Sequence, residues 1–308
     1  MATPVQPRFL PLEGLQLFVL EAGDDRLPLL VLHGFASSAL AWTEVIAALA
    51  EERRVVAYDR PGFGLSRVKG SWRGEDPFAP GAQVGIALAL LDRLGLERVA
   101  VLGHSLGGRL AYELAVSAPE RIAGAALVAP AWDRPSRPVL GRLLGRRPVS
   151  ALGRAVLRLA APAAFRLAER RLWASAPPAS SRARARELWA VPGWDEGLWR
   201  STVATLASPP SPAPDAAPPV PTLVVLGERD RIVANRRTLA LVERWRAAEA
   251  VLRVERFAAS GHLPHVEEFA RFVQVVRHFL EEVEDATPAA RGTRTRMGGD
   301  DDRRETHR

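Results

Sequence analysis

The stretch from Val99 to Arg109 constrains the fold of this chain more than any other. Four of its first five residues are apolar, Gly103-x-Ser105-x-Gly107 follows, and apolar residues at helical spacing come next. A serine with glycines two residues before and after it, between a buried strand and a helix, is typical of a nucleophile elbow. Such a turn predicts a strained serine backbone and a projecting hydroxyl. The alternative is a glycine-rich turn in which Ser105 caps the helix.

Short apolar runs alternate with helical patterns along most of the chain. Strands are predicted at 15–20, 29–32, 54–58, 99–102, 124–129, 222–226 and 251–257, and helices at 38–51, 81–94, 107–117, 235–247 and 265–283. Buried strands that alternate with helices favour a parallel sheet covered on both faces. The sequence therefore predicts an α/β fold.

One long segment breaks this alternation. Residues 131–221 contain no strand-like run, hold five of the eight tryptophans, and end in a proline-rich linker from Ser208 to Pro221. We therefore predict a core made of residues 1–130 and 222–283, with 131–221 inserted as a helical cap. Residues 284–308 are polar and lack apolar anchors. They are predicted to form a disordered tail.

Composition narrows the class of protein further. The chain has 308 residues and no cysteine, which excludes disulfides, cysteine nucleophiles and cysteine-bound metals. No apolar run is long enough to span a membrane, and the first residues do not resemble a signal peptide, so we expect a cytoplasmic protein. Nucleic-acid binding is not expected despite the pI of about 10.9, because Lys69 is the single lysine and no recognition motif is present.

Two further residues can complete the chemistry of Ser105. A serine hydroxyl is a weak nucleophile that needs a base, and the base needs an acid to orient it. Asp230 follows the predicted strand 222–226, and His262 follows the predicted strand 251–257. Loops at the carboxyl ends of parallel strands meet at one edge of the sheet. The order serine, aspartate, histidine therefore predicts one site built from three distant loops.

Five motifs resemble those of the α/β-hydrolase superfamily. They are His33-Gly-Phe35, Asp59-Arg-Pro-Gly-Phe-Gly-x-Ser66, Gly103-His-Ser-Leu-Gly-Gly108, Gly227-Glu-Arg-Asp230 and Gly261-His-x-Pro-His265. The resemblance covers roughly residues 12–130 and 220–283. It implies a mostly parallel sheet of the eight-stranded α/β-hydrolase type, with helices on both faces and a helical cap.

The resemblance also implies a role for each site residue. Ser105 would be the nucleophile, His262 the general base and then the general acid, and Asp230 the acid that orients His262. The oxyanion hole would consist of the backbone N–H groups of Phe35 and Leu106. No cofactor or metal is expected, because no His/Asp/Glu cluster has the spacing of metal ligands and no glycine-rich loop resembles a phosphate cradle.

Alternatives exist for two of these roles. His265 lies three residues after His262 and is a second candidate for the base, although we interpret it as structural. Asp133 follows the predicted strand 124–129 and is a second candidate for the acid. Asp59 and Arg60 are expected to shape their own loop rather than to act in catalysis.

The cap segment concentrates positive charge. Between Arg134 and Arg200 there are fourteen arginines and four acidic residues. The plain interpretation is a solvated helical surface, and the alternatives are electrostatic attraction of an anionic substrate, a carrier protein or a membrane surface. Arginines interleave with leucines in the basic amphipathic pattern of an interfacial helix, which Pro148 interrupts. These residues are Arg142, Arg146, Arg147, Arg154 and Arg158 with Leu140, Leu143, Leu144, Leu152 and Leu159. The simplest expectation is that the apolar face packs on the core.

Together these patterns predict a serine hydrolase. We expect it to cleave a small-molecule carboxylic ester with an apolar acyl or alcohol part through an acyl-enzyme, with an anionic or carrier-bound ester as variants. Alternatives are hydrolysis of a C–C bond in a diketone-like substrate, cofactor-free perhydrolysis, and acyl transfer. Outside catalysis, the chain could be a binding protein on a hydrolase fold. The presence of Ser105, Asp230 and His262 argues against that last alternative.

Overall fold

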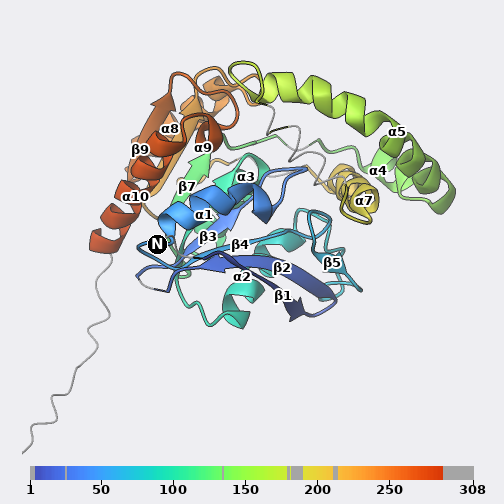
Figure 1. Ribbon diagram of the computed structural model, residues 1–308, viewed down its shortest axis with the longest axis horizontal. Helices are drawn as coiled ribbons and strands as arrows, with labels where there is room; N and C mark the ends of the chain where they lie inside the picture. The colour runs from blue at the N-terminus through green and yellow to red at the C-terminus, as the bar shows by residue number, and fades with distance from the viewer. Residues whose placement is uncertain are drawn as a thin grey trace, which may run out of the picture.

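The computed structural model describes residues 4–24, 26–133, 135–178, 181, 190–210 and 214–286. Within these residues, nine strands form one sheet in the order β1-β2-β4-β3-β6-β7-β8-β9, with β5 paired to β2 (Figure 1). The strands are β1 (Gln6–Leu12), β2 (Leu15–Ala22), β3 (Leu29–Leu32), β4 (Val55–Tyr58), β5 (Arg67–Val68), β6 (Val99–His104), β7 (Ile122–Val128), β8 (Thr222–Gly227) and β9 (Leu252–Phe257).

The sheet is parallel from β4 to β9 and antiparallel at its other end. β3 pairs with both β4 and β6 in parallel, and β6 through β9 continue in the same sense. β2 is antiparallel to β1, β4 and β5. The mostly parallel α/β sheet predicted from the alternating pattern is therefore confirmed.

Helices cover both faces of the sheet. The helices of the described residues are η1 (Ala39–Trp42), α1 (Thr43–Leu49), α2 (Ala82–Arg93), α3 (Leu106–Ser117), α4 (Pro138–Leu144), α5 (Arg147–Leu172), α7 (Trp194–Ala207), α8 (Asn235–Ala247), α9 (Pro264–Glu267) and α10 (Phe269–Ala286). One apolar core lies between the sheet and α2, α3 and α8. The second lies between the sheet and η1, α1 and α10. Successive residues of each central strand enter opposite cores, so these strands are buried throughout.

The apolar pattern of the sequence does not predict the first strand, β1. β1 is an edge strand, most of its side chains are exposed, and it contains Pro7 and Pro11. Proline lacks an N–H for the strand ladder and is tolerated at a sheet edge, where one side of the backbone needs no partner. Neither the burial pattern nor the proline content of such a strand resembles the buried runs from which the other strands were predicted.

The last helix extends beyond its predicted end. α10 runs to Ala286, so Glu284 and Asp285 are helical although we placed them in the tail. Glu284 forms an ion pair with the buried Arg53, with 2.6 Å between its Oε1 and Nη1 of the arginine. This contact with a distant residue explains why a polar helix end is held against the core. The remainder of the predicted tail, 287–308, lies outside the described residues.

Between β7 and β8, the described residues include the helices α4, α5 and α7, which lie beyond the carboxyl ends of the strands (Figure 1). The expectation that the leucines of α4 and α5 pack on the core is wrong. Leu140, Leu143, Leu152 and Leu159 are all exposed. The inner side of α5 instead meets α7 through Arg154 and Arg158, which pair with the buried Asp195. A buried carboxylate needs a partner of opposite charge, so Arg154 and Arg158 must face Asp195. The apolar side chains on the other side of α5 therefore face outward.

None of the helices in the described ranges is both long and apolar enough to cross a membrane.

Candidate active site

The turn between β6 and α3 holds Ser105 in a strained backbone conformation. Its φ is +54° and its ψ is −115°, outside the regions that non-glycine residues favour. A Cβ on Gly103 would lie 2.0 Å from the carbonyl oxygen of Gly107, and a Cβ on Gly107 would lie 2.1 Å from that of Leu32. Both positions therefore require glycine. The strained turn expected of the motif is present, and Ser105 does not cap the helix with its side chain.

Asp230 and His262 meet at the carboxyl ends of β8 and β9. The Nδ1 atom of His262 lies 2.7 Å from Oδ2 of Asp230, and both side chains are buried. The other carboxylate oxygen accepts hydrogen bonds from the backbone N–H groups of Ile232 and Val233 at 2.7 and 3.0 Å. The aspartate is thus fixed by backbone donors. Because the carboxylate accepts at Nδ1, the imidazole has its Nε2 available for the serine.

His104 ties the serine loop to the histidine loop. Its Nε2–H donates to the carbonyl oxygen of His262 across 2.8 Å, and the two imidazole rings lie 4.7 Å apart. Burial lowers the pKa of His104 well below its usual value, and the positive charge of a protonated His262 would lower it further. His104 is therefore a neutral donor. Within the described residues the Ser105 hydroxyl itself makes no hydrogen bond, a common state of catalytic groups without substrate.

The two alternative residues have other contacts. The imidazole of His265 is stacked on the indole of Trp42, with ring centroids 4.2 Å apart and planes inclined by 6°. Asp133 forms an ion pair with Arg237, and its side chain is exposed. Of the two candidate acids, it is therefore Asp230 that the structure shows bonded to His262.

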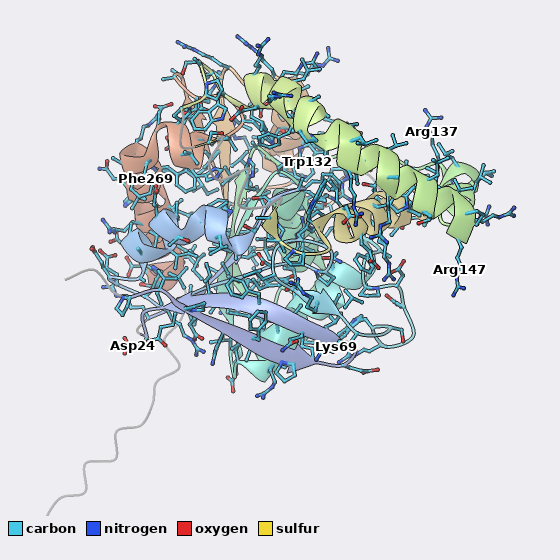
Figure 2. The ribbon with its side chains drawn as sticks, turned by 45° about the vertical axis from the view of Figure 1, so that its right-hand side comes forward. Asp24, Lys69, Trp132, Arg137, Arg147 and Phe269 are labelled. Carbon is cyan, nitrogen blue, oxygen red and sulfur yellow. The ribbon has the colours of Figure 1, made fainter. Side chains whose placement is uncertain are left out.

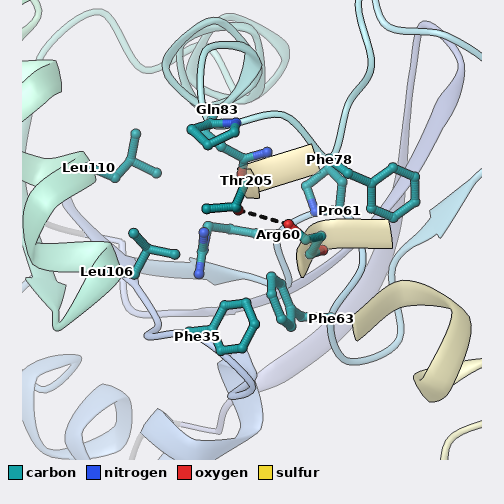
Figure 3. A pocket seen from close by; sticks show the side chains of 11 residues that line it. Phe35, Arg60, Pro61, Phe63, Phe78, Gln83, Leu106, Leu110 and Thr205 are labelled. Atoms are coloured by element: carbon teal, nitrogen blue, oxygen red, sulfur yellow. Dashed lines mark hydrogen bonds between the residues drawn. The ribbon is translucent and has the colours of Figure 1, made fainter. Parts of the chain in front are cut away.

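A pocket adjoins the elbow and contains both residues expected at the oxyanion hole. Its lining includes Phe35, Leu106 and Arg60, and Figure 3 shows the Arg60 side chain extending toward Leu106. Leu106 is the first residue of α3, so its N–H has no acceptor one turn earlier in the helix. The N–H groups of Phe35 and Leu106 donate to no other atom of the described residues.

The carbonyl group of Gly34 is held by two donors. His33 Nδ1–H donates to it at 2.8 Å and Arg60 Nη2–H at 3.0 Å. The backbone N–H of Arg60 in turn donates to Nε2 of His33 at 3.0 Å. In a trans peptide the C=O and the following N–H point in opposite directions. Fixing the Gly34 carbonyl therefore also fixes the direction of the Phe35 N–H.

This arrangement requires a neutral His33. The ring donates at Nδ1 and accepts at Nε2, which only the uncharged imidazole can do. Burial lowers the pKa of His33 well below its usual value, and the nearby charge of Arg60 lowers it further. From the sequence, Arg60 is expected only to shape its own loop. No sequence signal shows that its guanidinium crosses to Gly34, because the two residues lie on loops after different strands.

Asp59 shapes its loop, as expected. Its two carboxylate oxygens accept from the backbone N–H groups of Ala39 and Leu65, both at 2.6 Å. A Cβ on Gly64, whose φ is +52°, would lie 1.9 Å from Oδ2 of Asp59, so the loop can close only with glycine there. Burial raises the pKa of Asp59 to about 6, against the opposing effect of these two hydrogen bonds.

No group of three or more His, Cys, Asp or Glu side chains in the described part of the chain is arranged to hold a metal ion.

Comparison with known proteins identifies the family. A model of the alpha/beta hydrolase fold matches residues 28–269. The 2-hydroxymuconate semialdehyde hydrolase of Pseudomonas sp. (strain CF600) is 31% identical over 269 residues, which cover 84% of this chain and 88% of that protein.

Two solved structures share the architecture. The 2-hydroxy-6-oxo-6-phenylhexa-2,4-dienoate hydrolase of Rhodococcus sp. strain RHA1 has a TM-score of 0.69 and 23% identity, covering 91% of this chain and 99% of that chain. A thermophilic esterase from Thermogutta terrifontis has a TM-score of 0.69 and 24% identity with the same coverage. At these identities the likeness shows the fold alone. The family-model match and the 31% identical relative show that this chain is a hydrolase and belongs to the α/β-hydrolase fold family.

Proposed function

We propose that this protein is a serine hydrolase that cleaves a carboxylic ester through an acyl-enzyme. The observation that carries the proposal is the 2.7 Å bond between the buried Asp230 carboxylate and Nδ1 of His262. The backbone carbonyl of His262 accepts a hydrogen bond from His104, the residue directly before a serine in the strained conformation of a nucleophile elbow. A binding protein would not need a buried charged group to orient a histidine at this point.

In the proposed reaction, Oγ of Ser105 attacks the ester carbonyl while Nε2 of His262 takes its proton. The carbonyl oxygen becomes an oxyanion, which the N–H groups of Phe35 and Leu106 stabilise. His262 then gives the proton to the alcohol oxygen, which leaves. In the second half, His262 deprotonates a water molecule, which attacks the acyl carbonyl carbon. The bond to Oγ of Ser105 then breaks, His262 returns its proton to Oγ, and the acid is released. Asp230 remains ionised and holds the imidazolium.

The pocket favours an apolar acyl or alcohol part. Its lining is rich in apolar side chains, namely Phe35, Pro61, Phe63, Phe78, Pro80, Leu106 and Leu110. The charged member is Arg60, whose guanidinium is engaged by the Gly34 carbonyl. Gln83 of α2 and Ser201 and Thr205 of α7 complete the lining. The two α7 residues support the interpretation of 131–221 as a cap over the site.

A series of p-nitrophenyl esters of increasing acyl length tests this proposal. The wild-type protein should hydrolyse them, and Ser105→Ala should lower kcat by about 10⁴-fold or more. A fluorophosphonate probe should label the wild type at Ser105 and leave the variant unlabelled. Absence of turnover by the wild type, or equal turnover by Ser105→Ala, contradicts the proposal.

Hydrolysis of a C–C bond is the second candidate. It is favoured by the 31% identity to a protein described as a 2-hydroxymuconate semialdehyde hydrolase. Such chemistry would use the same nucleophile, base and oxyanion hole. The test is to measure kcat/KM for 2-hydroxymuconate semialdehyde and for the best p-nitrophenyl ester on one preparation. A higher value for the semialdehyde would replace the esterase assignment.

A further inference from the structure

The outer side of α5 carries a row of exposed apolar side chains. Leu152 is 67% exposed, Val156 56%, Leu159 84% and Leu167 62%. Their spacing of three, four or eight residues places them on one face of the helix. They cover about 22 Å of its length at 1.5 Å per residue. We call these four residues the α5 stripe.

Contacts on the opposite side keep the stripe facing outward. Arg154 and Arg158 each approach Asp195 of α7 to 3.0 Å, and Asp195 is buried. Burial alone would raise the pKa of Asp195, but hydrogen bonds from the two arginines hold it below its usual value. Gly153 packs against the indole of Trp199, where a Cβ would lie 2.1 Å from a ring atom. The helix therefore cannot roll to bury its stripe without breaking these contacts.

The end of α5 is bonded to the proposed catalytic loop. The backbone N–H of His262 donates to the carbonyl of Leu172 at 2.7 Å, and that of Ala174 donates to Oε2 of Glu267 at the same distance. The helix that carries the stripe is thus hydrogen-bonded directly to the loop that carries His262. A surface that contacts α5 would therefore lie on the side of the molecule where the loops at the carboxyl ends of the strands carry the site (Figure 1).

The stripe is accompanied by positive charge. Apart from the two arginines paired with Asp195, six exposed arginines lie on α5 or just before it: Arg142, Arg146, Arg147, Arg166, Arg170 and Arg171. Figure 2 shows Arg147 pointing away from the molecule at the outer end of the helix. Between Arg137 and Leu172 the one acidic residue is Glu169, which is buried and accepts a hydrogen bond from Ser181. The exposed surface of this helix is therefore apolar and cationic.

We propose that α5 is a docking surface for an anionic lipid bilayer, on which the helix lies in the plane of the headgroups. An amphipathic helix with apolar residues on one face and arginines beside them has the chemistry of an interfacial helix. The arginines would meet lipid phosphates, and the stripe would enter the boundary with the acyl chains. This proposal is independent of the reaction that Ser105 performs.

A second copy of the chain fits this surface less well. A symmetric contact through α5 would place the arginines of one copy against those of the other. No exposed acidic residue between 137 and 172 is present to offset their repulsion. An anionic bilayer surface supplies negative charge to pair with the arginines and an apolar layer in which the stripe can be buried. The charge of the helix therefore selects lipid as the occupant.

Co-sedimentation of the full chain with vesicles tests the proposal without reference to turnover. We expect binding to vesicles of phosphatidylcholine with phosphatidylglycerol, weaker binding to phosphatidylcholine alone, and weakening by added salt. Leu159→Asp should reduce partitioning of the protein onto vesicles about tenfold, because it removes one apolar side chain that would be buried in the bilayer. Val251→Asp is the control: it replaces another exposed apolar residue, 69% exposed, just before β9, at the amino end of that strand and therefore away from α5.

A second pair of variants separates charge from apolar burial. Arg170→Glu should weaken partitioning at least about fivefold. Arg98→Glu, an identical charge change just before β6, should have a smaller effect. Circular dichroism checks that each variant is folded. Failure of the wild type to bind anionic vesicles, or equal losses in Leu159→Asp and Val251→Asp, overturns the proposal. Sedimentation velocity that shows a dimer dissolved by Leu159→Asp, without vesicle binding, would assign the surface to a second copy.

Discussion

The elbow region and the α4–α5–α7 region are built on opposite principles. Around Ser105 the backbone is held by glycine contacts, and the buried side chains of His33, His104 and Asp230 each bond to backbone atoms. In the second region, the buried carboxylate of Asp195 pairs with two arginines to join α5 to α7, and large apolar side chains of α5 face outward. The backbone contacts around Ser105 hold the candidate catalytic residues in defined positions. The side-chain contacts between α5 and α7 leave the outer side of α5 free to contact another surface.

The largest expected effect tests whether the elbow region contains the chemistry. His262→Ala should lower kcat/KM for a p-nitrophenyl ester by about 10⁴-fold, because the serine loses its base. His265→Ala, a nearby histidine stacked on Trp42, is the control and should keep most activity. Initial rates on folded variants decide between them. The reverse result would move the base to His265.

Packing provides the next contrast between the two regions. Leu32→Ala should lower the free energy of unfolding by roughly 2–5 kcal/mol, because it leaves a cavity beneath the sheet. Leu159→Ala on the exposed stripe should change it by less than about 0.5 kcal/mol. Urea denaturation of the two variants measures both. A large loss in Leu159→Ala would mean that the stripe is buried in solution.

Acid should weaken the elbow region through its neutral histidines. Burial lowers the pKa of His33 and His104 in the folded state, so below pH 6.5 only the unfolded chain gains these protons. The free energy of unfolding should therefore fall as the pH drops below about 6.5. Asp59, with its pKa raised to about 6, acts in the opposite direction between about pH 6 and 4.

The variant His104→Gln isolates one of these contributions. Glutamine can still donate to the carbonyl of His262, but it has no proton to gain in this range. Urea denaturation at pH 7 and pH 5 should show a smaller loss in the variant than in the wild type. An unchanged difference would show that His104 does not resist protonation in the folded protein.

The smallest effect tests the carboxylate that joins α5 and α7. Asp195→Asn removes a charge shared by Arg154 and Arg158, but both arginines are partly exposed and solvent offsets much of the loss. We expect a local cost of about 1–2 kcal/mol. Amide exchange should accelerate in α5 and α7 and stay unchanged in β6 and α3. Glu196→Gln, on the same helix and half-exposed, should have little effect.

Features that depend on consecutive residues could be predicted from the sequence, and features that depend on contacts between distant residues could not. The buried strands were predicted because a run of apolar residues is a property of consecutive positions. The requirement for Gly103 and Gly107 came from the same short motif and is explained by backbone clashes. β1 was missed because an exposed edge strand lacks such a run. Arg60 was assigned only to its loop, because its contact with Gly34 depends on how two loops meet.

The sequence by itself determined the α/β fold and the set of residues at the candidate site. Alternating buried runs require a covered parallel sheet, and such a sheet brings the loops of Ser105, Asp230 and His262 to one edge. Tertiary structure alone decided which way α5 faces. Its amphipathic pattern shows two different sides but not which of them is inside. The buried Asp195 selected the arginine side, because an unpaired buried charge costs more than exposed leucines.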